Sequence, residues 1–127
     1  MLINNFFTIT TLEQTDGVIL STIKIDASHQ IFEGHFPNNP ITPGVVQIQL
    51  VKELLEKTFN QTLFLKEIGR CKFLAILNPN ENAEILIKID FTKEDGMIKV
   101  TADGTSKEGS QTFFKFNARY ERVININ

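Results

Sequence analysis

One helical segment stands in a chain that otherwise alternates apolar and polar residues, and this imbalance constrains the fold most strongly. Apolar side chains recur at helical spacing in residues 45–59. Residues 84–91 instead place Ile85, Ile87 and Ile89 on one side of a strand, between mostly charged neighbours. A sheet with one apolar face needs a cover, and the helix can supply it. We therefore expect an α+β fold in which a curved, mostly antiparallel sheet wraps one long central helix.

The rest of the chain predicts about six strands. Asp16-Gly17 and Asp95-Gly96 are hairpin turn signals, and Gly69 predicts a bend inside a long strand. At 127 residues, without an internal repeat or a linker, the chain is expected to form a single domain over residues 1–127. The expected strands cover residues 6–12, 18–26, 62–77, 84–91, 97–102 and 111–122.

The expected helix is amphipathic. Its apolar arc contains Gln47, whose amide needs hydrogen-bond partners if it is buried. The opposite, polar side should face water. The apolar arc is formed by Ile48, Leu50, Val51, Leu54, Leu55 and Phe59, and the polar side by Gln49, Lys52, Glu53 and Glu56.

Charge and cysteine usage exclude several classes of protein. A net charge of −2 gives no reason to expect nucleic acid, which usually leaves a basic patch on its partner. Cys71 is the one cysteine, so an intrachain disulfide is excluded and a cysteine-rich metal site is not supported. No apolar run approaches the roughly 18 residues of a membrane span, and the start lacks signal-peptide features. We expect a cytoplasmic protein without a metal site.

Residues 34–44 are the most informative motif for function. They place His35 in a segment with three prolines at intervals of three, which restrict the backbone and predict a stiff loop. Thr42 is a good N-cap and Pro43 a good first helical residue. The motif therefore brings a titratable ring close to the free N–H groups of a helix start, which can hold a carbonyl oxygen or an anion.

This motif carries a family resemblance. Gly34-His35-Phe36-Pro37, then Pro40, then Pro43-Gly44-Val45 resembles the active-site loop of hotdog-fold 3-hydroxyacyl-acyl-carrier-protein dehydratases. The likeness extends more weakly over residues 17–121, including Arg70-Cys71-Lys72-Phe73. It implies the hotdog fold and a lyase that removes water from a 3-hydroxyacyl thioester to give a trans-2-enoyl thioester, in fatty-acid or polyketide-type synthesis.

The resemblance also implies roles for particular residues. His35 would be the base, which suits an imidazole with an ordinary pKa near 6.5. The backbone N–H of Gly44 would hold the thioester oxygen, and Phe36 and Val45 would line the acyl site. Arg70 and Lys72, two residues apart on an expected strand, could meet the phosphate of a phosphopantetheine arm or an acidic carrier protein. The alternative for both is ordinary charge protection of a sheet edge.

One position departs from the family pattern. The family has glutamate or aspartate fourteen residues after the histidine, where this chain has Gln49. A neutral amide can donate a hydrogen bond but cannot deliver a proton. The proton could be shuttled by His35 itself or come from Glu53, although one helical turn moves a side chain by about 5 to 6 Å. Gln49 could also be a solvated residue without a role in the site.

The resemblance bears on partners as well. In that family the histidine of one protomer faces the acidic residue on the helix of its dimer partner. We therefore expect a homodimer or higher oligomer, or a heterodimer with a homologous dehydratase that retains the acid. The substrate would be an acyl thioester on acyl carrier protein or on coenzyme A, with no cofactor. A non-catalytic subunit or acyl-binding module is the alternative function, followed by a hotdog acyl thioesterase.

Overall fold

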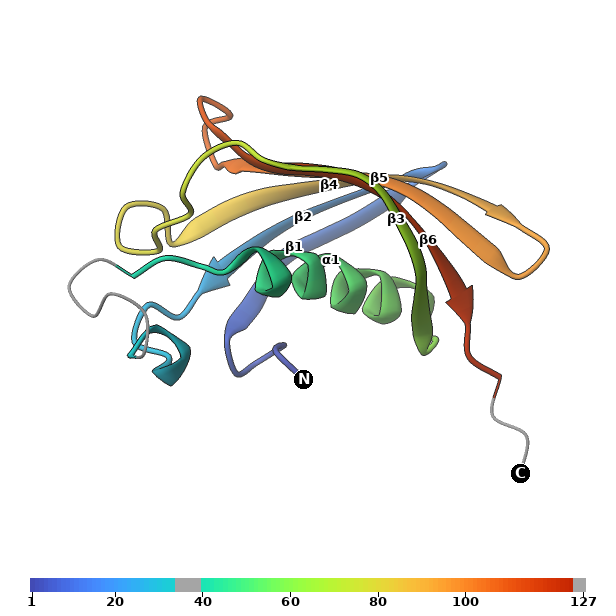
Figure 1. Ribbon diagram of the computed structural model, residues 1–127, viewed down its shortest axis with the longest axis horizontal. Coiled ribbons are helices and arrows are strands. Elements are labelled where there is room, and N and C mark those ends of the chain that lie inside the picture. Colours follow the sequence, from blue (N-terminus) through green and yellow to red (C-terminus); the bar gives the residue numbers. More distant parts are fainter. Residues whose placement is uncertain (34–39, 125–127) are drawn as a thin grey trace.

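The computed structural model describes residues 1–33 and 40–124, and residues 34–39 and 125–127 lie outside this description. Its sheet arches over one long helix, as Figure 1 shows. The elements are β1 (Phe7–Thr15), β2 (Val18–Ile25), the short 3-10 helix η1 (Gln30–Phe32), α1 (Gly44–Phe59), β3 (Leu63–Phe73), β4 (Glu84–Glu94), β5 (Met97–Ser106) and β6 (Thr112–Arg122).

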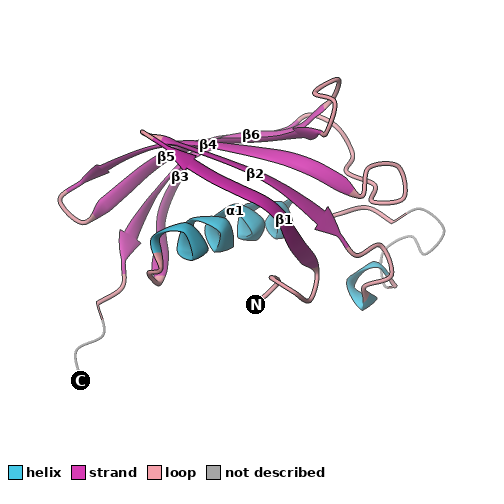
Figure 2. Cartoon of the chain, turned by 180° about the vertical axis from the view of Figure 1, so that it is seen from behind, coloured by secondary structure: helices cyan, strands magenta, loops and turns pink. Residues whose placement is uncertain are grey.

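The six strands form one antiparallel sheet in the order β1-β2-β4-β5-β6-β3. The strand that follows α1 therefore lies beside the last strand of the chain and becomes one edge of the sheet, while β1 is the other edge. Figure 2 shows the same arch from behind, with α1 beneath the curved strands. The expected α+β fold, a curved antiparallel sheet around a single long helix, is confirmed.

Both expected hairpin turns are present. Asp95 and Gly96 have positive φ values of 48° and 79°, and Glu94 pairs with Met97 on either side of them. Two consecutive positive φ angles are typical of a tight turn that matches the right-handed twist of the strands. Gly17 also has a positive φ, of 72°, in the turn that joins β1 to β2.

Strand ends differ from the expected ones. β1, β4 and β5 each continue beyond the expected range, into segments where the side chains of β1 and β4 are mostly exposed. Alternation marks a strand only where one face is buried, so the sequence pattern fades before the hydrogen-bonded ladder ends. β3, by contrast, stops at Phe73, and Leu77 accepts a hydrogen bond from the Thr42 N–H instead of joining the sheet.

The core forms between the inner face of the sheet and the apolar arc of α1. Both the alternation in β4 and the expected inner faces of β2 and β6 are buried as predicted. Burial of each large apolar side chain contributes about 1.5 to 3 kcal/mol relative to exposure. Buried residues include Leu50, Val51, Leu54 and Leu55 from α1, Ile19, Ile23 and Ile25 from β2, Ile85, Ile87 and Ile89 from β4, and Phe114, Phe116, Ala118 and Tyr120 from β6.

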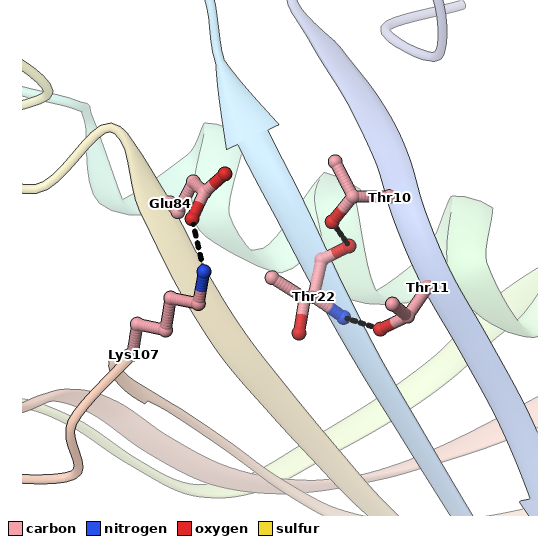
Figure 3. Close-up of polar contacts among 5 residues, drawn as sticks. All are labelled: Thr10, Thr11, Thr22, Glu84 and Lys107. Carbon is pink, nitrogen blue, oxygen red and sulfur yellow. Dashed lines mark hydrogen bonds and ion pairs between the residues drawn. The ribbon is translucent and has the colours of Figure 1, made fainter.

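Two irregularities shape the edge strands. In β1 the register shifts between Ile9 and Thr11, and threonine hydroxyls fill the gap: Thr10 Oγ1 donates to the Thr22 carbonyl at 2.8 Å, and the Thr22 N–H donates to Thr11 Oγ1 at 3.0 Å (Figure 3). Such a bulge bends the strand and raises its local twist. The same view shows the exposed ion pair between Lys107 and Glu84, at 2.8 Å.

The bend expected at Gly69 is also present. The pairing of β3 with β6 shifts register between Ile68 and Cys71. The Asn117 side chain fills the space, since its Oδ1 accepts the Arg70 N–H at 2.9 Å and a Cβ at Gly69 would overlap it. A glycine is therefore needed here for close approach of a neighbouring side chain.

Candidate functional site

The start of α1 differs by one residue from the sequence expectation. Pro43 is the N-cap residue and Gly44 the first helical residue, and no side chain of a described residue caps the helix. Thr42 does not act as the cap. Its N–H bonds to Leu77, and its buried hydroxyl has no partner among the described residues. The predicted Thr42 cap was therefore wrong, because the Thr42 backbone N–H is bonded to the segment after β3 and its side-chain oxygen accepts no N–H of the first turn.

The first turn does leave backbone donors free of helical acceptors. The first hydrogen bonds of α1 run from the Val46 and Gln47 N–H groups to the Pro43 carbonyl, at 3.1 and 3.2 Å. The N–H groups of Gly44 and Val45 precede them, and a helix offers no acceptor to its first residues. These two groups are therefore suited to hold a carbonyl oxygen or an anion.

Gly44 lies under an aromatic ring. A Cβ at this position would be 2.6 Å from Cζ and 2.8 Å from Cε2 of Phe73, so only glycine lets the ring lie so close. Phe73 is at the end of β3 and is half-exposed. Sequence reasoning did not assign it a role in the site, although it belongs to the segment that carries the resemblance, because its contact with Gly44 depends on the chain path after β3.

Exposed apolar side chains occur on the helix start and on the segment after β3, and the two meet through the Phe73–Gly44 approach and the Thr42–Leu77 hydrogen bond. Val45 is 77% exposed, and Leu74 and Ile76 are 55% and 62% exposed in the segment that follows Phe73. We call these four residues (Val45, Phe73, Leu74 and Ile76) the apolar rim. Exposed apolar groups that gather in one place usually mark a surface that contacts a ligand or a partner.

Two of the expected site residues, His35 and Phe36, lie outside the described residues, so their roles stay predictions. The segments on either side of them are anchored in the protein. Phe32, in η1, is buried and stacks at 5.5 Å between ring centroids against Phe6, and Pro40 is buried on the other side. The described residues on either side of positions 34–39 are therefore anchored in the protein, and Pro40 lies four residues before Gly44.

Gln49 is half-buried and hydrogen-bonded, not freely solvated. Its Nε2 donates to Glu53 Oε2 at 2.9 Å, one turn further along α1. Glu53 is fully buried, which contradicts its expected place on the solvated side of the helix. The reason is tertiary, because the N-terminal segment covers that side of α1 and donates the Leu2 and Ile3 N–H groups to Glu53 Oε1, at 2.8 and 3.0 Å.

These contacts decide what Glu53 can do. Both of its oxygens are occupied as acceptors, since Oε2 also lies 3.0 Å from the Leu2 nitrogen. A carboxylate held in this way is a structural acceptor, and it is not placed to give a proton to a substrate. This arrangement counts against the alternative in which Glu53 replaces the missing acid.

Gln47 is also buried, as its place in the apolar arc predicted. Its Nε2 donates to the Thr42 carbonyl at 3.0 Å, whereas its Oε1 has no partner among the described residues. The Thr42 hydroxyl oxygen is likewise buried without a hydrogen-bond partner among the described residues. Buried polar atoms without partners are uncommon in proteins, so two of them near the helix start support this region as a candidate binding site.

Arg70 and Lys72 are exposed on the edge strand β3. Neither forms an ion pair with another described residue, so both cations are available to an anionic group. Cys71, between them, has its pKa raised by burial, which disfavours a reactive thiolate. Whether Arg70 and Lys72 meet a phosphopantetheine phosphate or only protect the edge stays a prediction.

A groove of about 730 Å³ lies elsewhere, on the face of the sheet turned away from α1, and none of the expected site residues within the described ranges lines it. Within residues 1–33 and 40–124, no group of three His, Cys, Asp or Glu side chains is arranged to hold a metal ion. The candidate site is therefore the start of α1 with the apolar rim.

Comparison with known proteins identifies the family. A family model described as ApeI-like, ApeI dehydratase, matches residues 11–112. The chain belongs to the ApeI-like dehydratase family. A 3-hydroxyacyl-acyl-carrier-protein dehydratase FabZ from Thermoanaerobacter sp. strain X514 is 28% identical over 94 residues, which are 68% of this chain but only 64% of that protein. The FabZ of Lactobacillus helveticus is 26% identical over 114 residues, covering 80% of this chain and 76% of that protein.

Solved structures show the same fold. The dehydratase heterocomplex ApeI:P from Xenorhabdus doucetiae superposes with a TM-score of 0.70 at 23% identity, over 90% of this chain and 96% of that one. A putative thioesterase, yhdA from Lactococcus lactis, gives a TM-score of 0.68 at 10% identity, over 97% and 96% of the two chains. The predicted hotdog fold is thus confirmed, and members of this fold include both dehydratases and thioesterases.

A membrane-spanning helix was not expected from the sequence. In the part of the chain that the structure describes, no helix is long and apolar enough to cross a bilayer.

Proposed function

We propose that this ApeI-like chain is a subunit of a 3-hydroxyacyl-acyl-carrier-protein dehydratase, a lyase that converts a 3-hydroxyacyl thioester to a trans-2-enoyl thioester. The observation that carries the proposal is the conjunction of the family match with a helix start whose Gly44 and Val45 N–H groups have no acceptor in the helix, next to the apolar rim. The carrier could equally be coenzyme A, because both carriers present the same thioester.

The chemistry assigns each group one task. The His35 imidazole takes the proton from the α carbon, and negative charge develops on the thioester oxygen. The N–H of Gly44 stabilises that oxygen, which a side chain at this position would obstruct. The electron pair then forms the carbon–carbon double bond as the bond from the β carbon to its hydroxyl oxygen breaks. Phe36 and Val45 would contact the acyl chain.

The departing hydroxide needs a proton, and Gln49 cannot supply it. General acid–base assistance contributes about 10² to 10⁴ to the rate, or roughly 3 to 5 kcal/mol of barrier. A homodimer of this chain would therefore depend on water or on return of the proton by His35. Turnover by the chain alone is expected to be slow.

The sheet edges support an assembly of two or more chains. β3 has one side without a strand partner in the sheet order, and it exposes Phe64 (56%) and Phe73 (49%). An edge strand with exposed apolar side chains is a surface for pairing with another chain. A dimer formed through β3 would cover these side chains. Its partner could be a second copy or a homologous dehydratase.

The second candidate function is a partner-dependent subunit. The observation that favours it is Gln49, because a homologue with a carboxylic acid at this position would complete a site that contains His35 of this chain. The ApeI:P structure, a dehydratase heterocomplex with the same fold, supports a function that depends on a partner chain.

The experiment is hydration of a short trans-2-enoyl thioester, followed as loss of enoyl absorbance, with wild type and His35→Ala measured side by side. We expect slow turnover from wild type and at least a hundredfold less from His35→Ala, in line with loss of a general base. Equal rates in the two proteins would remove His35 from the mechanism. Release of free thiol from a saturated acyl thioester would instead favour a thioesterase.

A further inference from the structure

A buried carboxylate on the third turn of α1 has no part in the proposed chemistry. Glu53 is 0% exposed and accepts hydrogen bonds from Leu2, Ile3 and Gln49. Within residues 1–33 and 40–124 it forms no ion pair with a lysine, arginine or histidine. A buried acidic group persists only when hydrogen bonds compensate its lost hydration, and three N–H donors provide them here.

The contact with Gln49 fixes the orientation of an amide. The two ends of a glutamine amide have nearly the same shape but opposite hydrogen-bonding properties. An ionised carboxylate can only accept, so the group that faces Glu53 is the Gln49 nitrogen, at 2.9 Å. The Gln49 carbonyl oxygen is then the end left for other partners.

We propose that Glu53 is a positioning residue for position 49: it holds the Gln49 amide by its nitrogen, so that residue 49 presents its carbonyl oxygen and acts as a hydrogen-bond acceptor. This inference rests on the proposed function in placing residue 49 at the site. An acceptor there can bind the hydroxyl group of a 3-hydroxyacyl substrate, which is a hydrogen-bond donor. The chain would thus bind the hydroxyl group without being able to protonate it.

The arrangement also predicts what an acid at position 49 would experience. Gln49→Glu would place a second carboxyl group against Glu53, and two carboxyl groups at hydrogen-bond distance share a proton and titrate as a pair. Exchanging the groups, in Gln49→Glu/Glu53→Gln, leaves one carboxyl group beside an amide donor. The single and exchanged variants therefore differ in the protonation of residue 49.

The first test is the pH dependence of stability, which needs no activity. In Gln49→Glu the folded state binds a proton more tightly than an unfolded glutamate, whose pKa is about 4.3. Relative to wild type, this variant is then most stable below about pH 4.3. The additional stability is lost as the pH rises through the raised pKa of the carboxyl pair. We expect its unfolding equilibrium constant in urea to increase about tenfold relative to wild type between pH 3 and pH 8, which corresponds to about one pKa unit of coupling.

Two controls make this result specific. Gln111→Glu adds a carboxylate at an exposed position and should show no such increase. The exchanged variant, compared with Glu53→Gln alone, should also show none, because it contains no carboxyl pair. An unchanged pH dependence in Gln49→Glu would overturn the proposal, since the two side chains would then not interact.

The second test is the pH profile of enoyl hydration. The shared proton should keep residue 49 protonated to higher pH in Gln49→Glu than in the exchanged variant, so the alkaline limb of activity should lie at least one pH unit higher. If the alkaline limbs of the two variants lie at the same pH, Glu53 does not determine the protonation of residue 49. Absence of hydration in all variants would count against the proposed function, and the stability measurements would still decide the role of Glu53.

Discussion

The first and third turns of α1 differ in whether their buried polar atoms have hydrogen-bond partners. At the first turn, the Gln47 Oε1 and the Thr42 hydroxyl are buried without partners among the described residues. At the third turn, both oxygens of Glu53 are fully used by neighbouring N–H groups. The two turns belong to one helix and are covered by different segments: the third by the N-terminal residues, the first by the chain around Thr42 and Leu77.

This difference suggests a structural role for the third turn and a binding role for the first. A satisfied buried carboxylate stabilises the fold and orients its neighbour, whereas unpartnered atoms and free N–H groups cost stability unless something else binds them. The free groups occur at the helix start, close in sequence to the segment that contains His35. The acidic side chain that sequence reasoning considered as a substitute proton donor is instead an anchor for the N-terminus.

Glu53→Ala should give the largest effect on stability. It leaves the Leu2 and Ile3 N–H groups without an acceptor, and each unsatisfied buried group costs about 1 to 3 kcal/mol. We expect the free energy of unfolding in urea to fall by about 2 to 4 kcal/mol. Glu53→Gln retains an acceptor oxygen and should lose roughly half as much. A loss below about 1 kcal/mol for Glu53→Ala would contradict the satisfied state of the third turn.

Gln47→Met should have a smaller effect. It removes the hydrogen bond to the Thr42 carbonyl but also removes the unpartnered Oε1, in a side chain of similar volume. The two changes oppose one another, so we expect thermal or urea unfolding to shift by about 1 kcal/mol or less. A loss as large as that of Glu53→Ala would mean that Gln47 is fully satisfied in solution, and the contrast between the two turns would fail.

Gly44→Ala should change stability least and activity most clearly. Alanine favours a helix over glycine by about 0.5 to 1 kcal/mol, and the half-exposed Phe73 ring can move away from the new Cβ. We therefore expect stability within about 0.5 kcal/mol of wild type. Enoyl hydration should fall by about tenfold or more, because the added methyl group obstructs the thioester oxygen. An unchanged rate would remove the Gly44 N–H from the site.

Most of the fold could be predicted because period and turn chemistry are local. The alternation in residues 84–91, the turns at Asp16-Gly17 and Asp95-Gly96, and the bend at Gly69 are each visible over a few residues. The solvated ends of β1 and β4 were missed because alternation disappears where both faces of a strand meet water. The helix wheel likewise could not show that Leu2 and Ile3 cover Glu53, since that contact spans about 50 residues of sequence.

The candidate site was predicted only as far as local patterns reach. Gly44 and its free N–H followed from the helix start, whereas the Phe73 ring above Gly44 depends on where β3 ends. The expected role of Gln49 rests on its register with the family motif, whereas its hydrogen bond to Glu53 depends on which side of α1 is covered. The roles of all the expected site residues stay predictions: His35, Phe36, Gly44, Val45, Gln49, Arg70 and Lys72.

The central claim is that the site is shared between chains and lacks only an acid at position 49, and complementation tests it most directly. Wild type supplies His35 without an acid, and His35→Ala/Gln49→Glu supplies the acid without His35, so neither homodimer contains a complete site. Co-expressed in equal amounts, they should hydrate a trans-2-enoyl thioester faster than the sum of the two proteins alone. In a two-fold dimer the mixture should reach about a quarter of the specific activity of Gln49→Glu. Activity equal to the sum would contradict a shared site.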